Sequence, residues 1–169
     1  MLDLKISVLG IPRELAVPLD GIDTDDMLRH WRWLIDRSCV PMFATLLGDL
    51  FLRCRDGRIF FLDVGDATLT PVARNAEHFE LLLTDTEKTN YWFGGKLISE
   101  LRQAGLVAGP GHCYTYWQLP VLGGDYVPKN FKVVDVQTHF HIWGPIHEKI
   151  KDLPDGTQVK FVVVNKPEV

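Results

Sequence analysis

Three histidines in the last third of the chain have the residue type and spacing of a metal site. His139 and His141 are separated by one residue, and His147 lies further along the chain. Residues two apart on a β-strand project from the same face, so these two imidazoles could bind one zinc ion with His147 as a third ligand. One hypothesis is therefore a metal-binding or small-ligand-binding protein that uses these three histidines.

The residues around the histidine pair favour a second interpretation. We expect a strand over residues 131–142, on which two sets alternate: Val134, Val136, Thr138, Phe140 and Ile142 on one face, and Asp135, Gln137, His139, His141 and Trp143 on the other. The second set is largely polar, which is typical of a solvent-exposed face. No carboxylate follows closely to orient the imidazoles. We therefore predict no bound metal and no cofactor, with His147 in a turn that leads into a short helix starting at Pro145.

No catalytic motif accompanies the histidines. His147-Glu148 is followed by Lys-Ile-Lys, so the second histidine of the HExxH zinc-protease motif is missing. No phosphate-binding glycine loop and no GxSxG sequence is present. His112 adjoins Cys113, but neighbours on a strand point to opposite faces, which leaves only a Cys–His pair assembled from distant segments. We predict that the protein is not an enzyme.

Aromatic residues supply a different kind of candidate site. Tyrosine and tryptophan are enriched at protein interfaces, and several of them lie in the second half of the chain: Trp92, Tyr114, Tyr116, Trp117, Tyr126 and Trp143. Most of these rings are expected to complete the core, and one or two are expected on a contact surface. We take Tyr116, Tyr126, Trp143 and His147 as candidate partner-binding residues.

Composition limits the size of the fold and the compartment. With 169 residues, 46% of them hydrophobic, the chain fits one compact domain. No apolar run approaches the roughly 20 residues that span a bilayer. The start of the chain has an acid where a signal peptide has basic residues. The three cysteines (Cys39, Cys54 and Cys113) form no CxxC pair, so we expect free, buried thiols in a reducing cytoplasm.

The formal net charge of −4 argues against nucleic-acid binding, which requires a dense basic face. We therefore predict no nucleic-acid partner and no membrane association. The composition does not indicate an oligomeric state.

Turn and capping residues divide the chain into short elements. We predict a strand over residues 4–9, a helix capped by Asp23 that runs to Ile35, and a hairpin of residues 49–54 and 58–63 around Asp56-Gly57. Asn75 caps a short helix, and Thr84 caps a second helical stretch that Gly94-Gly95 kinks or divides before it ends at Gly105. Strands are expected over residues 113–119, 131–142 and 159–164, with a turn at Asp155-Gly156 before the last one. This order predicts a single α+β domain with a mostly antiparallel twisted sheet and helices packed on one side.

Several of these segments, in this order, resemble a family long catalogued as a domain of unknown function. The segments are Gly48-Asp49-Leu50-Phe51, Phe61-Leu62-Asp63-Val64, Phe79-Glu80-Leu81-Leu82, Cys113-Tyr114-Thr115-Tyr116, Pro120 to Tyr126, Val136 to Phe140, Gly144-Pro145-Ile146-His147 and Lys151 to Thr157. The resemblance covers residues 31–159. It departs from the family at Pro145, where glutamine is usual.

The resemblance implies a function that no motif of the chain supplies. The family forms the C-terminal domain of immunity proteins that neutralise type VI secretion DNase effectors. It thus implies a cytoplasmic protein that binds and occludes a cognate antibacterial toxin and has no catalysis of its own. Larger members carry an additional N-terminal GAD-related domain, so residues 1–30 are expected to be a shortened lead-in and residues 31–169 the immunity-type domain. A stand-alone interaction module is the remaining alternative.

Overall fold

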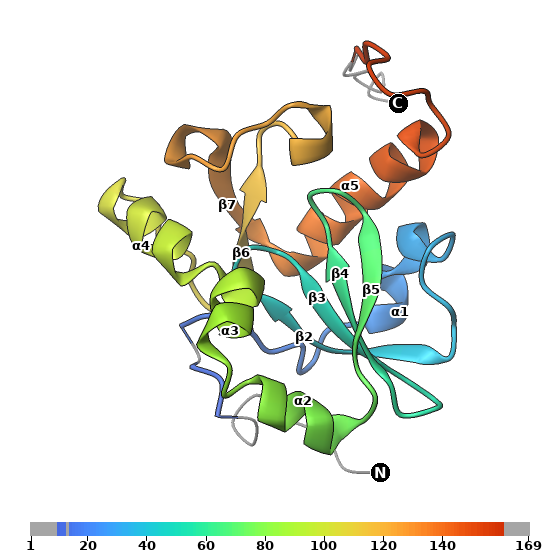
Figure 1. Cartoon of the computed structure of the whole chain (residues 1–169). Coiled ribbons are helices and arrows are strands. Elements are labelled where there is room, and N and C mark those ends of the chain that lie inside the picture. Colours follow the sequence, from blue (N-terminus) through green and yellow to red (C-terminus); the bar gives the residue numbers. More distant parts are fainter. Residues whose placement is uncertain (1–9, 13, 161–169) are drawn as a thin grey trace.

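A five-stranded antiparallel sheet forms the centre of the computed structural model, which describes residues 10–12 and 14–160 (Figure 1). Its strands follow one another in chain order: β1 (Ala16–Val17), β2 (Cys39–Thr45), β3 (Leu50–Cys54), β4 (Ile59–Asp63) and β5 (Thr68–Ala73). A two-stranded antiparallel sheet joins β6 (His112–Tyr116) to β7 (Phe131–Asp135). The predicted α+β class with a mostly antiparallel sheet is confirmed.

The helices are short except for the last one. They are α1 (Thr24–Met27), α2 (Ala76–Leu82), α3 (Thr86–Phe93), α4 (Gly95–Gln103) and α5 (Val136–Ile150). Three single-turn 3-10 helices, η1 (Arg29–Trp31), η2 (Pro120–Leu122) and η3 (Pro128–Asn130), connect them to the strands. In the part of the chain that the structure describes, no helix is both long and apolar enough to cross a membrane.

The predicted hairpin is present and fixes the register of the sheet. Asp56 accepts a hydrogen bond from the Arg58 backbone (3.0 Å), and Gly57 takes a left-handed φ of 89°. The strands then pair with Leu50 opposite Leu62. As predicted for its continuous apolar sequence, β4 is an interior strand between β3 and β5.

Helices cover both faces of the large sheet, so the prediction of helices on one side is wrong. On one face, Phe51 packs with α2 and α3 through Phe79 and Trp92. On the other face, Leu50 and Leu52 share a core with η1 and α5 (Figure 1). The physical reason is that Leu50, Phe51 and Leu52, consecutive residues of β3, are all apolar, and each of the two faces therefore needs a covering layer.

The N-terminal helix begins where predicted but ends early. Asp23 accepts hydrogen bonds from the backbone of Asp25 and Asp26 (both 3.1 Å), yet α1 ends at Met27 and continues only as η1. Trp31 in η1 donates from Nε1 to the Phe140 carbonyl (2.9 Å), which ties this segment to α5. The strand predicted over residues 4–9 lies outside the described residues.

The middle helices follow their local signals closely. Asn75 caps α2, as predicted. Asp85, and not Thr84, caps α3 by accepting from the Glu87 and Lys88 backbones. Gly94, with a φ of 56°, ends α3, so the stretch is two helices. Gly105 follows α4 in the expected position with a φ of 86°.

The strand predicted over residues 131–142 is wrong beyond Asp135. Asp135 accepts from the Thr138 backbone (2.9 Å) and caps α5. The buried residues of α5 recur at helical and not strand spacing: Val136, His139, Phe140, Trp143 and His147. Pro145 therefore lies inside this helix instead of starting a new one. Gly144 lets α5 approach η1, because a Cβ there would lie 2.8 Å from the His30 carbonyl oxygen.

The cysteines also differ from the prediction. Cys39 and Cys54 lie opposite each other on β2 and β3 and form a disulfide, so the prediction of three free thiols is wrong for this pair. Cross-strand pairing brings them together although they are 15 residues apart in the sequence. Cys113 is free and buried, as expected.

The C-terminal end of the described chain has turns but no strand. Thr157 donates its backbone N–H to the Pro154 carbonyl (3.1 Å), and Gly156 has a φ of 81°, which confirms the predicted turn. Residues 159–160 form no strand, and the rest of the strand predicted over 159–164 lies outside the described residues.

Candidate functional site

The most N-terminal of the three histidines is fully enclosed in a hydrogen-bonded network. His139 places Nε2 3.0 Å from the Gly48 carbonyl and Nδ1 2.8 Å from the Thr115 hydroxyl oxygen. A carbonyl can only accept, so Nε2 carries the proton and Nδ1 accepts from Thr115. Trp143 donates to the same hydroxyl oxygen (2.7 Å). Burial lowers the pKa of His139 to about 4, so the ring is neutral near pH 7.

The other two histidines point to different partners. His141 contacts Asp26, with Nε2 2.9 Å from its carbonyl oxygen and 3.2 Å from its carboxylate. His147 is buried and donates to the Val64 carbonyl (2.7 Å), and burial lowers its pKa. The expectation that His139 and His141 share an exposed face is wrong, because residues two apart on a helix diverge by about 200°. Within residues 10–12 and 14–160, no three His, Cys, Asp or Glu side chains come together as a metal site.

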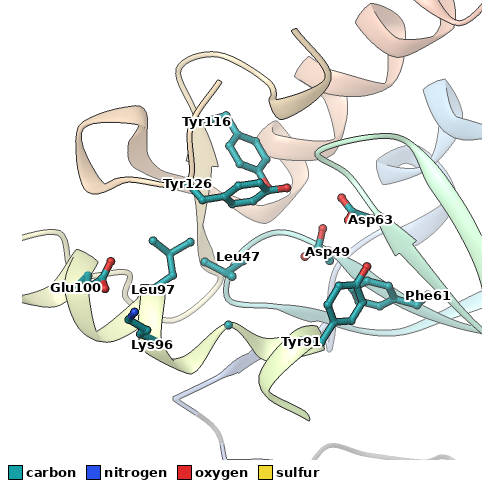
Figure 2. A pocket seen from close by; sticks show the side chains of 11 residues that line it. Leu47, Asp49, Phe61, Asp63, Tyr91, Lys96, Leu97, Glu100, Tyr116 and Tyr126 are labelled. Carbon is teal, nitrogen blue, oxygen red and sulfur yellow. The ribbon is translucent and has the colours of Figure 1, made fainter. Parts of the chain in front are cut away.

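A pocket of about 410 Å³ is a stronger candidate site (Figure 2). It lies where the β2–β3 turn and β4 meet α3, α4 and the segments that carry Tyr116 and Tyr126. Its lining combines acidic, aromatic and aliphatic side chains: Leu47, Asp49, Phe61, Asp63, Tyr91, Lys96, Leu97, Glu100, Tyr116 and Tyr126, with Gly94.

Asp49 is held rigidly at the floor of this pocket. Its backbone closes the β2–β3 turn with Thr45, donating to the Thr45 hydroxyl (3.1 Å) and accepting from the Thr45 N–H (2.8 Å). Its carboxylate oxygen Oδ1 accepts from the Val64 backbone (2.9 Å). The residue is only 8% exposed. Burial, and then the nearby charge of Asp63, raise the pKa of Asp49 well above its ordinary value.

Asp63 is the second carboxylate of the pocket. Asp63 is the last residue of β4 and follows Leu62, whose partner Leu50 directly follows Asp49, so the two acids lie at the same end of the hairpin. Burial and the charge of Asp66 raise the pKa of Asp63. Among the described residues, no Lys or Arg forms an ion pair with either carboxylate, although Lys96 lines the same pocket.

Three tyrosines form the aromatic part of the pocket. Tyr116 is buried, and its ring meets that of Tyr126 edge to face at 6.2 Å between centroids. Tyr126 and Tyr91 are 51% and 73% exposed and stand at the mouth. Burial, followed by the nearby carboxylates, raises the pKa of all three hydroxyls. The nearby carboxylates disfavour further negative charge in the pocket, and a bound cation or hydrogen-bond donor would complement them.

The structure brings together two of the four predicted partner-binding residues. Tyr116 and Tyr126 line the pocket, whereas Trp143 and His147 are buried in the core around α5. Sequence reasoning missed Asp49, Asp63 and Tyr91. A signal for the two carboxylates was present, because a hairpin centred on Asp56-Gly57 places residues 49 and 63 at the same end.

The comparisons with known proteins agree with the resemblance seen in the sequence. The family model described as T6SS immunity protein Tdi1, C-terminal, matches residues 73–147. This match confirms the predicted family resemblance over a shorter range than expected. It includes α3, α4, Tyr116 and Tyr126, while Asp49 and Asp63 lie before it. No curated protein matches the chain.

Proposed function

We propose that this chain, matched over residues 73–147 by a type VI secretion immunity family, binds a cognate antibacterial toxin and blocks it by occlusion. The toxin is a nuclease effector in this proposal, and the protein acts in the cytoplasm of the cell that makes it. Occlusion requires a complementary surface and no catalytic group of its own.

The family match is the single observation that carries this proposal. The matched residues 73–147 include both exposed tyrosines of the pocket, Tyr91 and Tyr126, so part of the pocket wall belongs to the segment that resembles the immunity family. A specific interface buries about 1,200–2,000 Å² in total, which is much larger than the pocket alone. The pocket is therefore proposed as one part of the contact surface.

The metal-binding alternative receives no support from the geometry of its ligands. His139 and His147 are buried and hydrogen-bonded to backbone carbonyls, and His141 contacts Asp26. Elemental analysis of protein purified without a tag remains the direct measurement, and a stoichiometric metal would revive this alternative.

Co-expression with the effector encoded beside the gene tests the immunity role. The expected result is survival of cells that express both proteins and death of cells that express the effector alone. The purified pair should also form a complex by isothermal titration calorimetry, and nuclease activity should fall in proportion to the complex formed. Failure of the neighbouring effector to bind would overturn the proposal and favour a stand-alone interaction module.

A further inference from the structure

We propose that the pocket formed by Asp49, Asp63, Tyr91, Tyr116 and Tyr126 receives an arginine side chain of a protein partner. The identity of that partner as a toxin rests on the proposed function, whereas the binding chemistry rests on the pocket itself. Three independent features of the pocket lead to this inference.

The first feature is an incompletely satisfied buried carboxylate. Oδ1 of Asp49 accepts from Val64, but no described group donates to Oδ2, and no described Lys or Arg lies within ion-pair distance. Oδ2 is not fully enclosed and faces the open pocket, where a donor can reach it. A largely buried carboxylate is poorly hydrated, so it gains from a donor and a positive charge supplied by a partner. A guanidinium group would supply both the missing donors and the missing positive charge.

The second feature is the closeness of two acids at the same end of a hairpin, one just before β3 and one at the end of β4. Like charges that lie close together repel each other. The register ends with Leu50 opposite Leu62, and the next residues outward, Asp49 and Asp63, both line the pocket and interact electrostatically. Figure 2 shows the Asp49 carboxylate between Tyr126 and Tyr91, with Asp63 further out on the same side. A cation between them would convert this repulsion into two attractive contacts.

The third feature is the shape and chemistry of the walls. Tyr91 and Tyr126 offer ring faces on which a planar guanidinium can stack. Leu47 and Leu97 offer an apolar wall for the methylene groups of the side chain. A lysine ammonium gains less from this arrangement, because it is a compact, strongly hydrated charge that cannot form the bidentate contact.

Other ligand classes fit the pocket less well. A phosphate or a nucleic-acid backbone would be repelled by Asp49, Asp63 and Glu100, with only Lys96 to attract it. A metal ion requires several ligands converging on one point, and the described residues contain no such group of three. The two carboxylates could also transfer protons, but that chemistry leaves the aromatic mouth without a role.

The test uses N-acetyl-arginine methylamide as the probe and the citrulline analogue, which is uncharged but nearly identical in shape, as its control. In a ¹⁵N-labelled NMR titration of the full chain, the arginine compound should shift the amides of Asp49, Gly94 and Tyr126 with a dissociation constant of about 1–10 mM. The citrulline compound should shift them at least about tenfold more weakly. Equal shifts with both compounds, or no shifts at these amides, would overturn the proposal.

A second measurement uses variants and the effector. Asp49→Asn keeps an oxygen for the Val64 hydrogen bond, and Asp63→Asn keeps one for the Asp66 backbone contact. The double variant should bind the effector at least about a hundredfold more weakly. The matched control is Asp152→Asn, an exposed carboxylate paired only with Lys151, which should bind as the wild type does.

Tyr126→Ala, at a half-exposed position, adds a variant that leaves both carboxylates of the pocket unchanged, and it should weaken binding about tenfold. Unchanged affinity in folded pocket variants would overturn the arginine site while leaving the immunity role intact. Conversely, absence of effector binding by the wild type would overturn the immunity role. The arginine titration would still show whether the pocket binds an arginine side chain.

Discussion

The histidine network and the acidic pocket lie on either side of one turn of chain, Gly48-Asp49, and differ in how their polar groups are satisfied. The Gly48 carbonyl accepts from His139, and every nitrogen of that ring has a partner. The next residue, Asp49, faces the pocket with one oxygen unpartnered and with Asp63 at the same end of the hairpin. A fully satisfied buried network rigidifies a core, whereas a partly satisfied one at an open pocket leaves a group that can accept a ligand. The first region is structural, and the second is where recognition is proposed.

The largest expected effect comes from crowding the turn that the two regions share. Gly48 has a φ of 91°, and a Cβ there would collide with the His139 ring. Gly48→Ala should therefore lower the free energy of unfolding by about 3–4 kcal/mol, from backbone strain and overpacking together. Urea denaturation followed by circular dichroism measures this change.

Gly57→Ala is the matched control for Gly48→Ala. Gly57 has nearly the same φ of 89°, but a Cβ at this position would meet no other atom within 4 Å. The Gly57→Ala variant should lose only about 1–2 kcal/mol of unfolding free energy, which is the cost of the left-handed backbone alone. Equal losses at the two glycines would show that the His139 ring does not constrain the turn.

Acid should destabilise the histidine network. Since the folded pKa of His139 is about 4 and the ordinary value is 6.5, the unfolded chain binds a proton first as the pH falls. Stability from His139 is therefore complete above pH 6.5 and is lost progressively down to about pH 4, by about 3 kcal/mol. His147, whose pKa is also lowered by burial, acts in the same direction. Denaturation midpoints measured from pH 7.5 to 4.5 test this.

Protonation of the acidic pocket should change the free energy of unfolding in the opposite direction as the pH falls. Asp49 and Asp63 have raised folded pKa values, so the folded chain binds their protons before the unfolded chain does. Their contribution to stability therefore increases as the pH falls toward the ordinary aspartate value. The Asp49→Asn variant lacks part of this stabilisation, so its free energy of unfolding should fall more steeply with decreasing pH than that of the wild type. A shallower pH dependence in the variant would contradict the raised pKa of Asp49.

Removing the hydroxyl between His139 and Trp143 should have a smaller effect. Thr115 donates to His139 and accepts from Trp143, so Thr115→Val leaves two buried polar groups without partners. The expected loss is about 2 kcal/mol, with no change in effector affinity because Thr115 lies outside the pocket. Thr115→Ser, which keeps the hydroxyl, is the control. A Thr115→Val variant as stable as wild type would show that the network contributes no net stability.

The two regions also differ in how well the sequence predicts them. The hairpin and the caps Asp23 and Asn75 were predictable because turn and capping chemistry is local. The strand predicted over residues 131–142 was wrong beyond Asp135 because polar and apolar residues alternate there over a span too short to separate the strand and helix periods. Long-range contacts decide in favour of the helix, among them the Trp31 hydrogen bond to Phe140.

The acidic pocket needed three-dimensional information for a different reason. Tyr116 and Tyr126 could be selected as aromatic residues, but neither indicates a partner without the two carboxylates. Asp49 and Asp63 are individually ordinary acids at strand ends, and only the hairpin register makes them a pair. Exposure also could not be read from residue type, since Trp143 and His147 are buried while Tyr91 is 73% exposed.

The smallest expected effect has the opposite sign and separates stability from recognition. Asp49→Asn removes a buried carboxyl group whose charged form is disfavoured by burial and by Asp63, and it should raise the free energy of unfolding at pH 7 by about 1 kcal/mol. The same variant should bind the effector more weakly, because the guanidinium group loses its buried counter-charge. Thermal denaturation of the free protein and calorimetry of the complex measure the two effects. A residue that lowers stability and strengthens binding has a role in recognition. An Asp49→Asn variant that is less stable than the wild type and binds the effector normally would instead show that Asp49 has a structural role, as His139 does.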